Sequence, residues 1–330
     1  MTPHPLLTEL TTRVRAQAHS ATTACPCGAT DATDTTTLTD RPDATVVRHA
    51  HTVAKAHAPD TNPTTLTPRL TTATHLPDIL LPPLTPTPTH LHGRLVTFWP
   101  YGTPVDPNTP DVAPWEEAAT LLARLHRTPT RSIPPGLPPM RGPLKAAQAI
   151  ARLRTTATTA TATTAPHPAT ATAPVLRAWN TLPPWARAET PMPDTTTLCH
   201  GDLHLGQLVR HPAPDGPWRL IDVDDLGTGP PAWDLARPAA WYACGLLTPD
   251  EWTRFLTAYR TAGGPAVPAD GDPWPTLDVP ARALTAQTAA RSITKAVAAG
   301  RPLDDVEQAL VDACDRMGST PPELTSGFPA

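Results

Sequence analysis

The stretch Cys199–Asp234 reads C-H-G-D-L-H-L-G-Q-L-V-R-H-P-A-P-D-G-P-W-R-L-I-D-V-D-D-L-G-T-G-P-P-A-W-D. Asp202 follows His-Gly, Gln207 lies five residues later, and Asp222 ends a short apolar run. The segments 208–210 and 218–221 are β-prone, and the turn residues between them end in Asp-Gly. We therefore predict a loop that leads into a β-hairpin. Antiparallel pairing would bring Gln207 close to Asp222, with Asp202 beside them.

Two carboxylates and an amide at this spacing suit phosphoryl transfer. That reaction requires one carboxylate to accept the proton of an attacking hydroxyl, and oxygen ligands for Mg²⁺. Asp202 suits the first role. Asp222 and the amide oxygen of Gln207 suit the second, because Mg²⁺ is a hard cation that takes few protein oxygens. The rival interpretation is a metallophosphatase site beginning at residues 201–204, but the sequence has no later Gly-Asn-His and no cluster of histidines.

The same residues resemble the protein-kinase-like superfamily, in which His-x-Asp-x-x-x-x-Asn precedes an aspartate at a strand end. The glycine after histidine, with Ile221–Asp225 and Asp234-Leu-Ala, is similar to the aminoglycoside phosphotransferase family. That family phosphorylates small molecules such as aminoglycosides, choline, homoserine and sugars. The resemblance implies ATP as the phosphoryl donor, Asp202 as the catalytic base, Gln207 and Asp222 as Mg²⁺ ligands, and Asp234 as a structural acid behind the loop.

Gln207 departs from the family pattern, which usually has asparagine at this position. The longer side chain keeps the neutral oxygen but moves it by about one bond, and Mg²⁺ tolerates poor geometry badly. Maltokinase-like sugar kinases of the family also have His-Leu-Gly-Gln here. The departure is therefore compatible with activity and favours a sugar-like acceptor.

Residues 35–57 predict a small antiparallel meander with Lys55 in its last strand. In kinase-like folds this strand carries the lysine that pairs with the nucleotide phosphates. No Gly-x-Gly-x-x-Gly loop precedes Lys55, and the helix expected over 63–73 has no glutamate to pair with it. Two alternatives stay open: another acid substitutes, or phosphate alone holds Lys55.

A second hairpin is predicted over residues 90–99, and Pro100-Tyr101-Gly102 then marks a hinge. By resemblance, the backbone near Phe98 and Trp99 would bind adenine and the two rings would flank it. A purely structural role in the core is an equal alternative for both aromatic side chains.

We expect an α+β fold of the bilobal protein-kinase-like type, with a small antiparallel-sheet N-lobe and a mostly helical C-lobe. Residues 1–100 would form the nucleotide-binding lobe with a leading helix, and residues 101–330 the helical lobe with the catalytic loop and acceptor site. Helices are predicted over 114–126, 175–188, 231–242, 249–259, 279–299 and 303–317. The Ala/Thr/Pro-rich segment 155–174 is predicted to be a mobile insertion where acceptor-binding helices would lie.

Composition excludes several classes of protein. The chain has 330 residues, a net charge of −4 and a pI near 6.3, so a nucleic-acid partner is not expected. There is no long apolar run and no signal-like N-terminus, and five cysteines predict no disulfide framework. Cys25 and Cys27 lack a second ligand pair for zinc. We therefore expect a cytoplasmic protein, with no membrane contact, that is a monomer or a homodimer.

The leading hypothesis is an ATP- and Mg²⁺-dependent kinase that acts on a small-molecule hydroxyl acceptor (a sugar, an aminoglycoside or an amino alcohol). The alternative is a nucleotide-binding pseudokinase, motivated by the missing helix acid, the missing glycine loop and Gln207. A protein kinase is a third option, but the sequence has no Ala-Pro-Glu segment. The sequence leaves the identity of the acceptor open.

Overall fold

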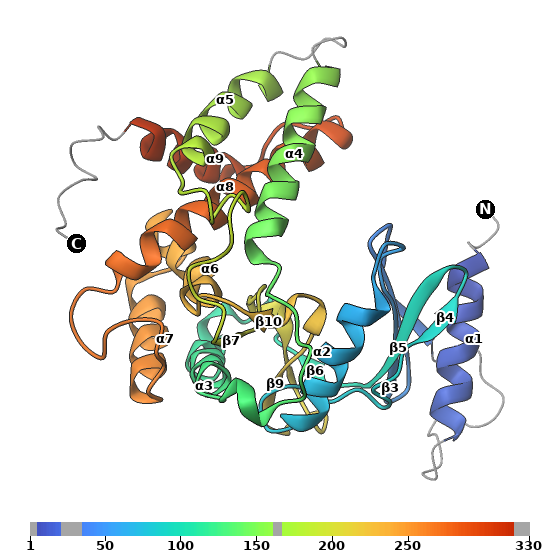
Figure 1. The fold of residues 1–330 in the computed structure, drawn as a ribbon. Helices are drawn as coiled ribbons and strands as arrows, with labels where there is room; N and C mark the ends of the chain where they lie inside the picture. The colour runs from blue at the N-terminus through green and yellow to red at the C-terminus, as the bar shows by residue number, and fades with distance from the viewer. Residues whose placement is uncertain (1–4, 21–34, 161–166, 320–330) are drawn as a thin grey trace. The chain divides into compact units, whose positions relative to one another are not determined.

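The computed structural model describes residues 5–20, 35–160 and 167–319, which belong to two compact units (Figure 1). The first unit takes the described residues of Met1–Leu121, Pro129–Pro138 and Leu205–Asp224. The second takes those of Leu122–Thr128, Pro139–His204 and Asp225–Ala330. The predicted division of the chain into lobes at residue 100 stays a prediction. Cys25 and Cys27 lie outside the described residues.

The first unit is built on an antiparallel sheet with the strand order β1-β2-β3-β5-β4. Its elements are α1 (Pro5–Ser20), β1 (Thr35–Arg41), β2 (Ala44–His49), β3 (Thr52–Ala56), α2 (Pro63–His75), β4 (Thr89–Leu91) and β5 (Arg94–Pro100). The meander predicted over residues 35–57 and the hairpin predicted over 90–99 are both present. Strands β3 and β5 pair in the centre of the sheet, so the predicted nucleotide lysine lies on a central strand.

Helix α1 packs on one face of this sheet (Figure 1). Leu6, Leu10 and Val14 recur at helical spacing and enter one core cluster with sheet residues that include Ala54 and Ala56. Side chains alternate between the two faces of a strand, so Lys55 lies on the face away from α1. The burial of α1 thus fixes the direction in which Lys55 points.

A second, smaller sheet in this unit has the order β6-β8-β9. It comprises β6 (Thr103–Pro104), β8 (Leu208–Arg210) and β9 (Trp218–Leu220). Leu208 pairs with Leu220 and Arg210 with Trp218, as the predicted hairpin requires. Short 3-10 turns complete the unit at η2 (Pro110–Val112), η3 (Thr130–Ser132) and η4 (Leu205–Gln207).

The second unit is mostly helical. Its elements are α4 (Gly142–Ala160), α5 (His167–Asn180), α6 (Ala232–Ala243), α7 (Pro249–Thr261), α8 (Trp274–Ala298) and α9 (Asp305–Ser319), with the antiparallel pair β7 (Leu198–Cys199) and β10 (Gly227–Thr228). Helix α3 (Trp115–His126) and turn η5 (Val223–Asp225) carry residues of both units. With the sheets of the first unit, these helices give the expected α+β fold of the protein-kinase-like type.

Two predictions about helices need correction. The segment 155–174 was expected to be a mobile insertion, but α4 continues to residue 160 and α5 begins at 167, while residues 161–166 lie outside the described residues. Alanine is the best helix former, and Thr155 satisfies its hydroxyl by donating to the Ala151 carbonyl. The helix expected over 175–188 ends at Asn180, so Trp185 lies in a turn. Pro183 and Pro184 follow the helix end and cannot extend it.

Within the described part of the chain, no helix combines the length and hydropathy needed to cross a bilayer.

We predict that Leu10→Ala lowers the free energy of unfolding by about 2–5 kcal/mol, because Leu10 is fully buried between α1 and the sheet. Thr12→Ala, on the exposed face of the same helix, is the control and should change it by less than about 0.5 kcal/mol. Urea titration of both variants measures the difference. Equal stability of the two variants would contradict the packing of α1 on the sheet.

Candidate active site

Lys55 contacts two carboxylates in the first unit. Its Nζ lies 2.6 Å from Oδ1 of Asp222 and 3.0 Å from Oδ2 of Asp224. The Lys55 side chain is only 13% exposed. Burial lowers the pKa of Lys55, but Asp222 and Asp224 outweigh it and raise the pKa well above its usual range. The amine is therefore a fixed cation at neutral pH.

Asp224 is the acid that pairs with Lys55 in addition to Asp222, a role for which the sequence indicated no residue. Helix α2 provides no glutamate, and the acid that pairs with Lys55 beside Asp222 comes from η5. Asp224 also accepts from the buried His57, whose Nδ1 lies 3.2 Å from Oδ2. The other nitrogen of His57 lies 2.8 Å from the Thr97 hydroxyl on β5. Asp224 is therefore anchored to the central strands of the sheet through both Lys55 and His57.

Gln207 and Asp222 lie together, as the hairpin predicts. The backbone N–H of Ile221 donates to the Gln207 carbonyl at 2.9 Å, and the Gln207 amide lies 3.4 Å from Oδ2 of Asp222. Asp222 has φ +63°, a left-handed conformation that turns the chain sharply just after β9. This pair offers carboxylate and amide oxygens, the hard donors that suit Mg²⁺.

Phe98 and Trp99 point to opposite faces of the sheet. Phe98 belongs to the core cluster with α1, so its ring has the structural role that we weighed as an alternative. Trp99 pairs in register with Val53, and its Nε1 donates to the Thr97 hydroxyl at 2.9 Å. Trp99 therefore shares a face with Thr97, the register partner of Lys55. A role for either residue in binding adenine stays a prediction.

Asp202 lies in the second unit, and two cations hold its carboxylate. Nζ of Lys145 on α4 lies 2.6 Å from Oδ2, and the Arg237 guanidinium on α6 lies 2.7 Å from Oδ1. Lys145 also contacts Asp225 at 2.5 Å. Burial raises the pKa of Asp202, but Lys145 and Arg237 outweigh it and hold the pKa well below its usual range. Because Gln207 and Asp222 belong to the other unit, the meeting of all three residues stays a prediction.

Asp234 fixes the backbone of the loop that carries Asp202. The N–H groups of His200 and Gly201 donate to its two carboxylate oxygens at 2.6 and 2.7 Å. Gly201 has φ +86°, and a Cβ there would lie 2.4 Å from the Asp225 carbonyl oxygen. Only glycine fits this position, which gives the His-Gly-Asp sequence a steric reason.

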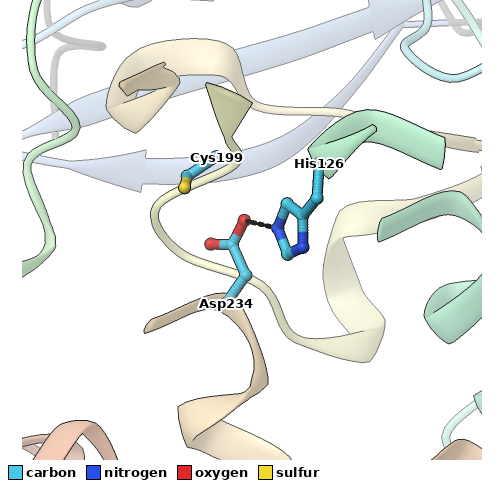
Figure 2. A group of neighbouring side chains, drawn as sticks. All are labelled: His126, Cys199 and Asp234. Carbon is cyan, nitrogen blue, oxygen red and sulfur yellow. Dashed lines mark hydrogen bonds and ion pairs between the residues drawn. The ribbon is translucent and has the colours of Figure 1, made fainter. Parts of the chain in front are cut away.

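A buried hydrogen-bond chain in turn supports Asp234. The Tyr259 hydroxyl accepts from the Ala266 N–H at 3.0 Å and donates to Nδ1 of His126 at 2.7 Å. The Nε2–H of His126 then donates to Asp234 at 3.0 Å (Figure 2). An ionised carboxylate can only accept hydrogen bonds, so this series of hydrogen bonds places the proton of His126 on Nε2. Helices α3, α6 and α7 together position the loop.

His126, Asp234 and the buried Cys199 lie close enough to be tested as a metal site (Figure 2). Both oxygens of Asp234 already accept backbone N–H groups. Burial raises the pKa of the Cys199 thiol well above its usual range, so it remains protonated and donates to the Gly229 carbonyl at 3.2 Å. These donors serve the loop, and the cluster does not fit a metal ion.

Sequence reasoning missed Lys145 and Arg237, which lie far from Asp202 along the chain. It gave no definite role to Asp225, although this residue lies in the segment that resembles the family. One signal was available. The chain has 26 Lys and Arg residues, and lysine occurs only at positions 55, 145 and 295. Two of these three lysines each bridge a pair of acids. The rarity of lysine could therefore have singled out Lys145 as well as Lys55.

Solved structures share this fold at low sequence identity. A choline/ethanolamine kinase family protein from Mesorhizobium loti is 16% identical and has a TM-score of 0.52, with 95% of this chain and 96% of that chain covered. A thermostable mutant of aminoglycoside phosphotransferase APH(4)-Ia, solved with AMP-PNP and hygromycin B, is 14% identical with a TM-score of 0.54 and 90% and 95% coverage. Spectinomycin phosphotransferase APH(9)-Ia, solved with ADP and spectinomycin, is 15% identical with a TM-score of 0.51 and 87% and 89% coverage.

Comparison of the sequence with curated proteins found no significant match. The model of the phosphotransferase enzyme family, in contrast, matches residues 30–275, which include the sheet, the catalytic loop and the hairpin. The chain therefore belongs to the phosphotransferase enzyme family and is a phosphotransferase with a protein-kinase-like fold.

Proposed function

We propose that this protein is an ATP-dependent, Mg²⁺-requiring kinase that transfers the γ-phosphoryl group to a hydroxyl of a small molecule. Family membership supplies the reaction class. The observation that carries the proposal is Asp202, which ion pairs and a fixed backbone hold as an ionised carboxylate. Structurally similar proteins act on aminoglycosides or belong to the choline/ethanolamine kinases, which supports a small-molecule acceptor.

In the proposed reaction, the acceptor hydroxyl donates a hydrogen bond to Asp202. Its oxygen forms a bond to the γ-phosphorus while the bond from that phosphorus to the bridging oxygen of ADP breaks. The proton passes to Asp202 as the new bond forms, and ADP leaves. Asp202 has a depressed pKa and so acts mainly by orienting the hydroxyl, which is sufficient because the transition state of phosphoryl transfer is loose.

On the nucleotide side, Lys55 is proposed to bind the phosphates as a permanent cation. Asp222 and Gln207 would hold Mg²⁺, which supplies charge neutralisation to the phosphates when bound. One of the three reasons for the pseudokinase alternative was the missing acid of α2. Asp224 pairs with Lys55, so this reason for the alternative loses its weight.

We predict that Asp202→Asn lowers kcat by about 10²–10⁴-fold, because it removes the group that orients and deprotonates the hydroxyl. The affinity for ATP should stay nearly unchanged. Asp215→Asn, an exposed acid in the turn of the hairpin, is the matched control and should retain full turnover. ADP release and calorimetric titration with ATP measure the two properties. Full turnover by the Asp202→Asn variant would remove the base assignment.

We predict that Lys55→Gln weakens ATP binding by about tenfold or more, because it removes a charge-assisted contact to the phosphates. The exposed Lys295→Gln is the matched control. Thermal unfolding should accompany the titration, since the change also leaves Asp222 and Asp224 without their shared cation. A folded Lys55→Gln variant with wild-type ATP affinity would disprove the role of Lys55.

We predict that Lys145→Gln moves the acidic limb of the kcat/KM profile to higher pH. Lys145 helps to hold the pKa of Asp202 below its usual range, so the wild-type carboxylate stays ionised well into the acidic range. Loss of this cation raises the pKa, and protonation then removes the base at a higher pH. Profiles from about pH 4 to pH 8 test the shift, with Lys295→Gln as control. Superimposable profiles would show that Lys145 does not tune Asp202.

A further inference from the structure

The surroundings of Asp202 contain more positive than negative charge. Lys145 and Arg237 hold the carboxylate, and Lys145 also bridges to Asp225. Arg141, just before α4, lies 3.8 Å from Asp225. Two acids are thus already neutralised by three cations. An acceptor whose hydroxyl lies at Asp202 would therefore be close to these cations.

Two further arginines extend this charge along the neighbouring helices. Arg152 follows Lys145 by seven residues on α4, so both lie on one face of the helix. Arg291 follows Gln287, a residue that lines the small pocket beside Asp202, by one turn of α8. Helices α4 and α8 run close together in the second unit (Figure 1). The two arginines therefore lie on adjacent helices that both lead to Asp202.

Electrostatics supports this placement. Arg291 is exposed as a residue, but desolvation by the packed helices lowers the pKa of its guanidinium. Asp202 and Asp225 oppose this shift, whereas Arg237 and Arg152 add to it. Arg291 therefore lies within electrostatic range of the proposed base and of two other arginines. Asp202 and Asp225 already pair with other cations, so they offset only part of the repulsion among the arginines.

No acid on these helices relieves the repulsion. Helix α4 contains no Asp or Glu, and the sole acid of α8, Asp278, pairs with Arg282. Among the described residues, neither Arg152 nor Arg291 forms an ion pair or a hydrogen bond. A solvated helix surface usually mixes both signs of charge. The surface formed by Arg152 and Arg291 carries only positive charge, and it lies near the loop that carries Asp202.

We propose that the acceptor is a hydroxyl compound that also carries a carboxylate or phosphate group, which Arg152 and Arg291 bind while the hydroxyl lies at Asp202. This inference rests on the proposed kinase function. Seven helical residues separate Lys145 from Arg152, which corresponds to roughly 10 Å. An acceptor about as long as a substituted sugar ring therefore spans the two ends. Polycationic acceptors such as aminoglycosides are disfavoured, because the surface repels them.

One sugar ring supplies a matched set of probes: glucose is neutral, glucuronate carries a carboxylate, glucose 6-phosphate a phosphate, and glucosamine an ammonium group. Calorimetric titration at low ionic strength should show that at least one of the two anions binds about tenfold or more tightly than glucose, with glucosamine weakest. Tighter binding of glucuronate would identify a carboxylate as the anionic group of the acceptor, and tighter binding of glucose 6-phosphate would identify a phosphate. Equal or tighter binding of glucose or glucosamine overturns the proposal, as does the absence of saturable binding by both anions.

Variants locate the binding site. Arg152→Gln and Arg291→Gln should each weaken binding of the preferred anion about tenfold and leave glucose binding unchanged. Arg154→Gln, exposed on another face of α4, is the matched control and should have no effect. An equal loss in the Arg154 variant, or no loss in the other two, overturns the assignment.

ADP release separates this inference from the kinase function. Turnover of glucose or glucosamine without turnover of either anion would leave the kinase standing and reject the anionic acceptor. Arginine-dependent anion binding by an enzyme that consumes no ATP with any of the four probes would count against the kinase function instead.

Discussion

The arrangement depends on carboxylates that are gathered in partly buried positions and held together in pairs by a shared lysine. Removing carboxylates from water is costly, and several of them together repel one another unless a cation lies between them. Lys55 performs this task for Asp222 and Asp224, and Lys145 performs it for Asp202 and Asp225. In each unit, the cation and its two acids hold one another in place, so the side chains proposed to bind ligands are already ordered. Such preorganisation is what phosphoryl transfer requires, because the protein contributes mainly position and charge.

The loop that carries Asp202 is ordered from behind by a different kind of interaction. Asp234 accepts two successive backbone N–H groups, so it fixes the direction of the main chain. His126 donates a further hydrogen bond to Asp234, and the Tyr259 hydroxyl donates to the other ring nitrogen of His126. A fully satisfied buried network specifies one arrangement, because every alternative leaves a polar group without a partner. Charge therefore sets the ionisation of Asp202, while hydrogen bonds set its position.

Much of the fold could be predicted from the sequence, because the local sequence signals favour the same secondary structure that tertiary packing stabilises. The Asp-Gly turn and the flanking β-prone runs predicted the pairing of β8 with β9, and this placed Gln207 beside Asp222. Strand alternation alone could not show that Phe98 faces α1, since the sequence does not reveal which face of β5 a helix covers. For the Ala/Thr-rich segment 155–174, sequence reasoning predicted less regular structure than is present. Its low complexity indicated mobility, whereas the helix propensity of alanine favours the continuation of α4 to residue 160.

The parts of the site that sequence reasoning missed are those that depend only on tertiary contacts. Lys145 lies 57 residues before Asp202, and no local pattern links the two. Arg237 lies 35 residues after Asp202, and no local pattern links these two residues either. Asp224 belongs to the segment that resembles the family, but the sequence does not show which residue it contacts. In the structure it faces Lys55, which resolves how that lysine obtains a second acid without a glutamate from α2.

The cations around Asp202 have two opposed consequences for the proposed reaction. They keep the carboxylate ionised, but a carboxylate with a depressed pKa is also a weaker base. An enzyme that needed early proton transfer would lose rate from this arrangement. In a loose transition state the hydroxyl loses its proton late, so orientation matters more than basicity and the loss is small. The same cations remain positive after they neutralise Asp202 and Asp225, and they extend through Arg291 to Arg152. On the proposals above, the charge that keeps Asp202 ionised would therefore also select the acceptors that bind beside it.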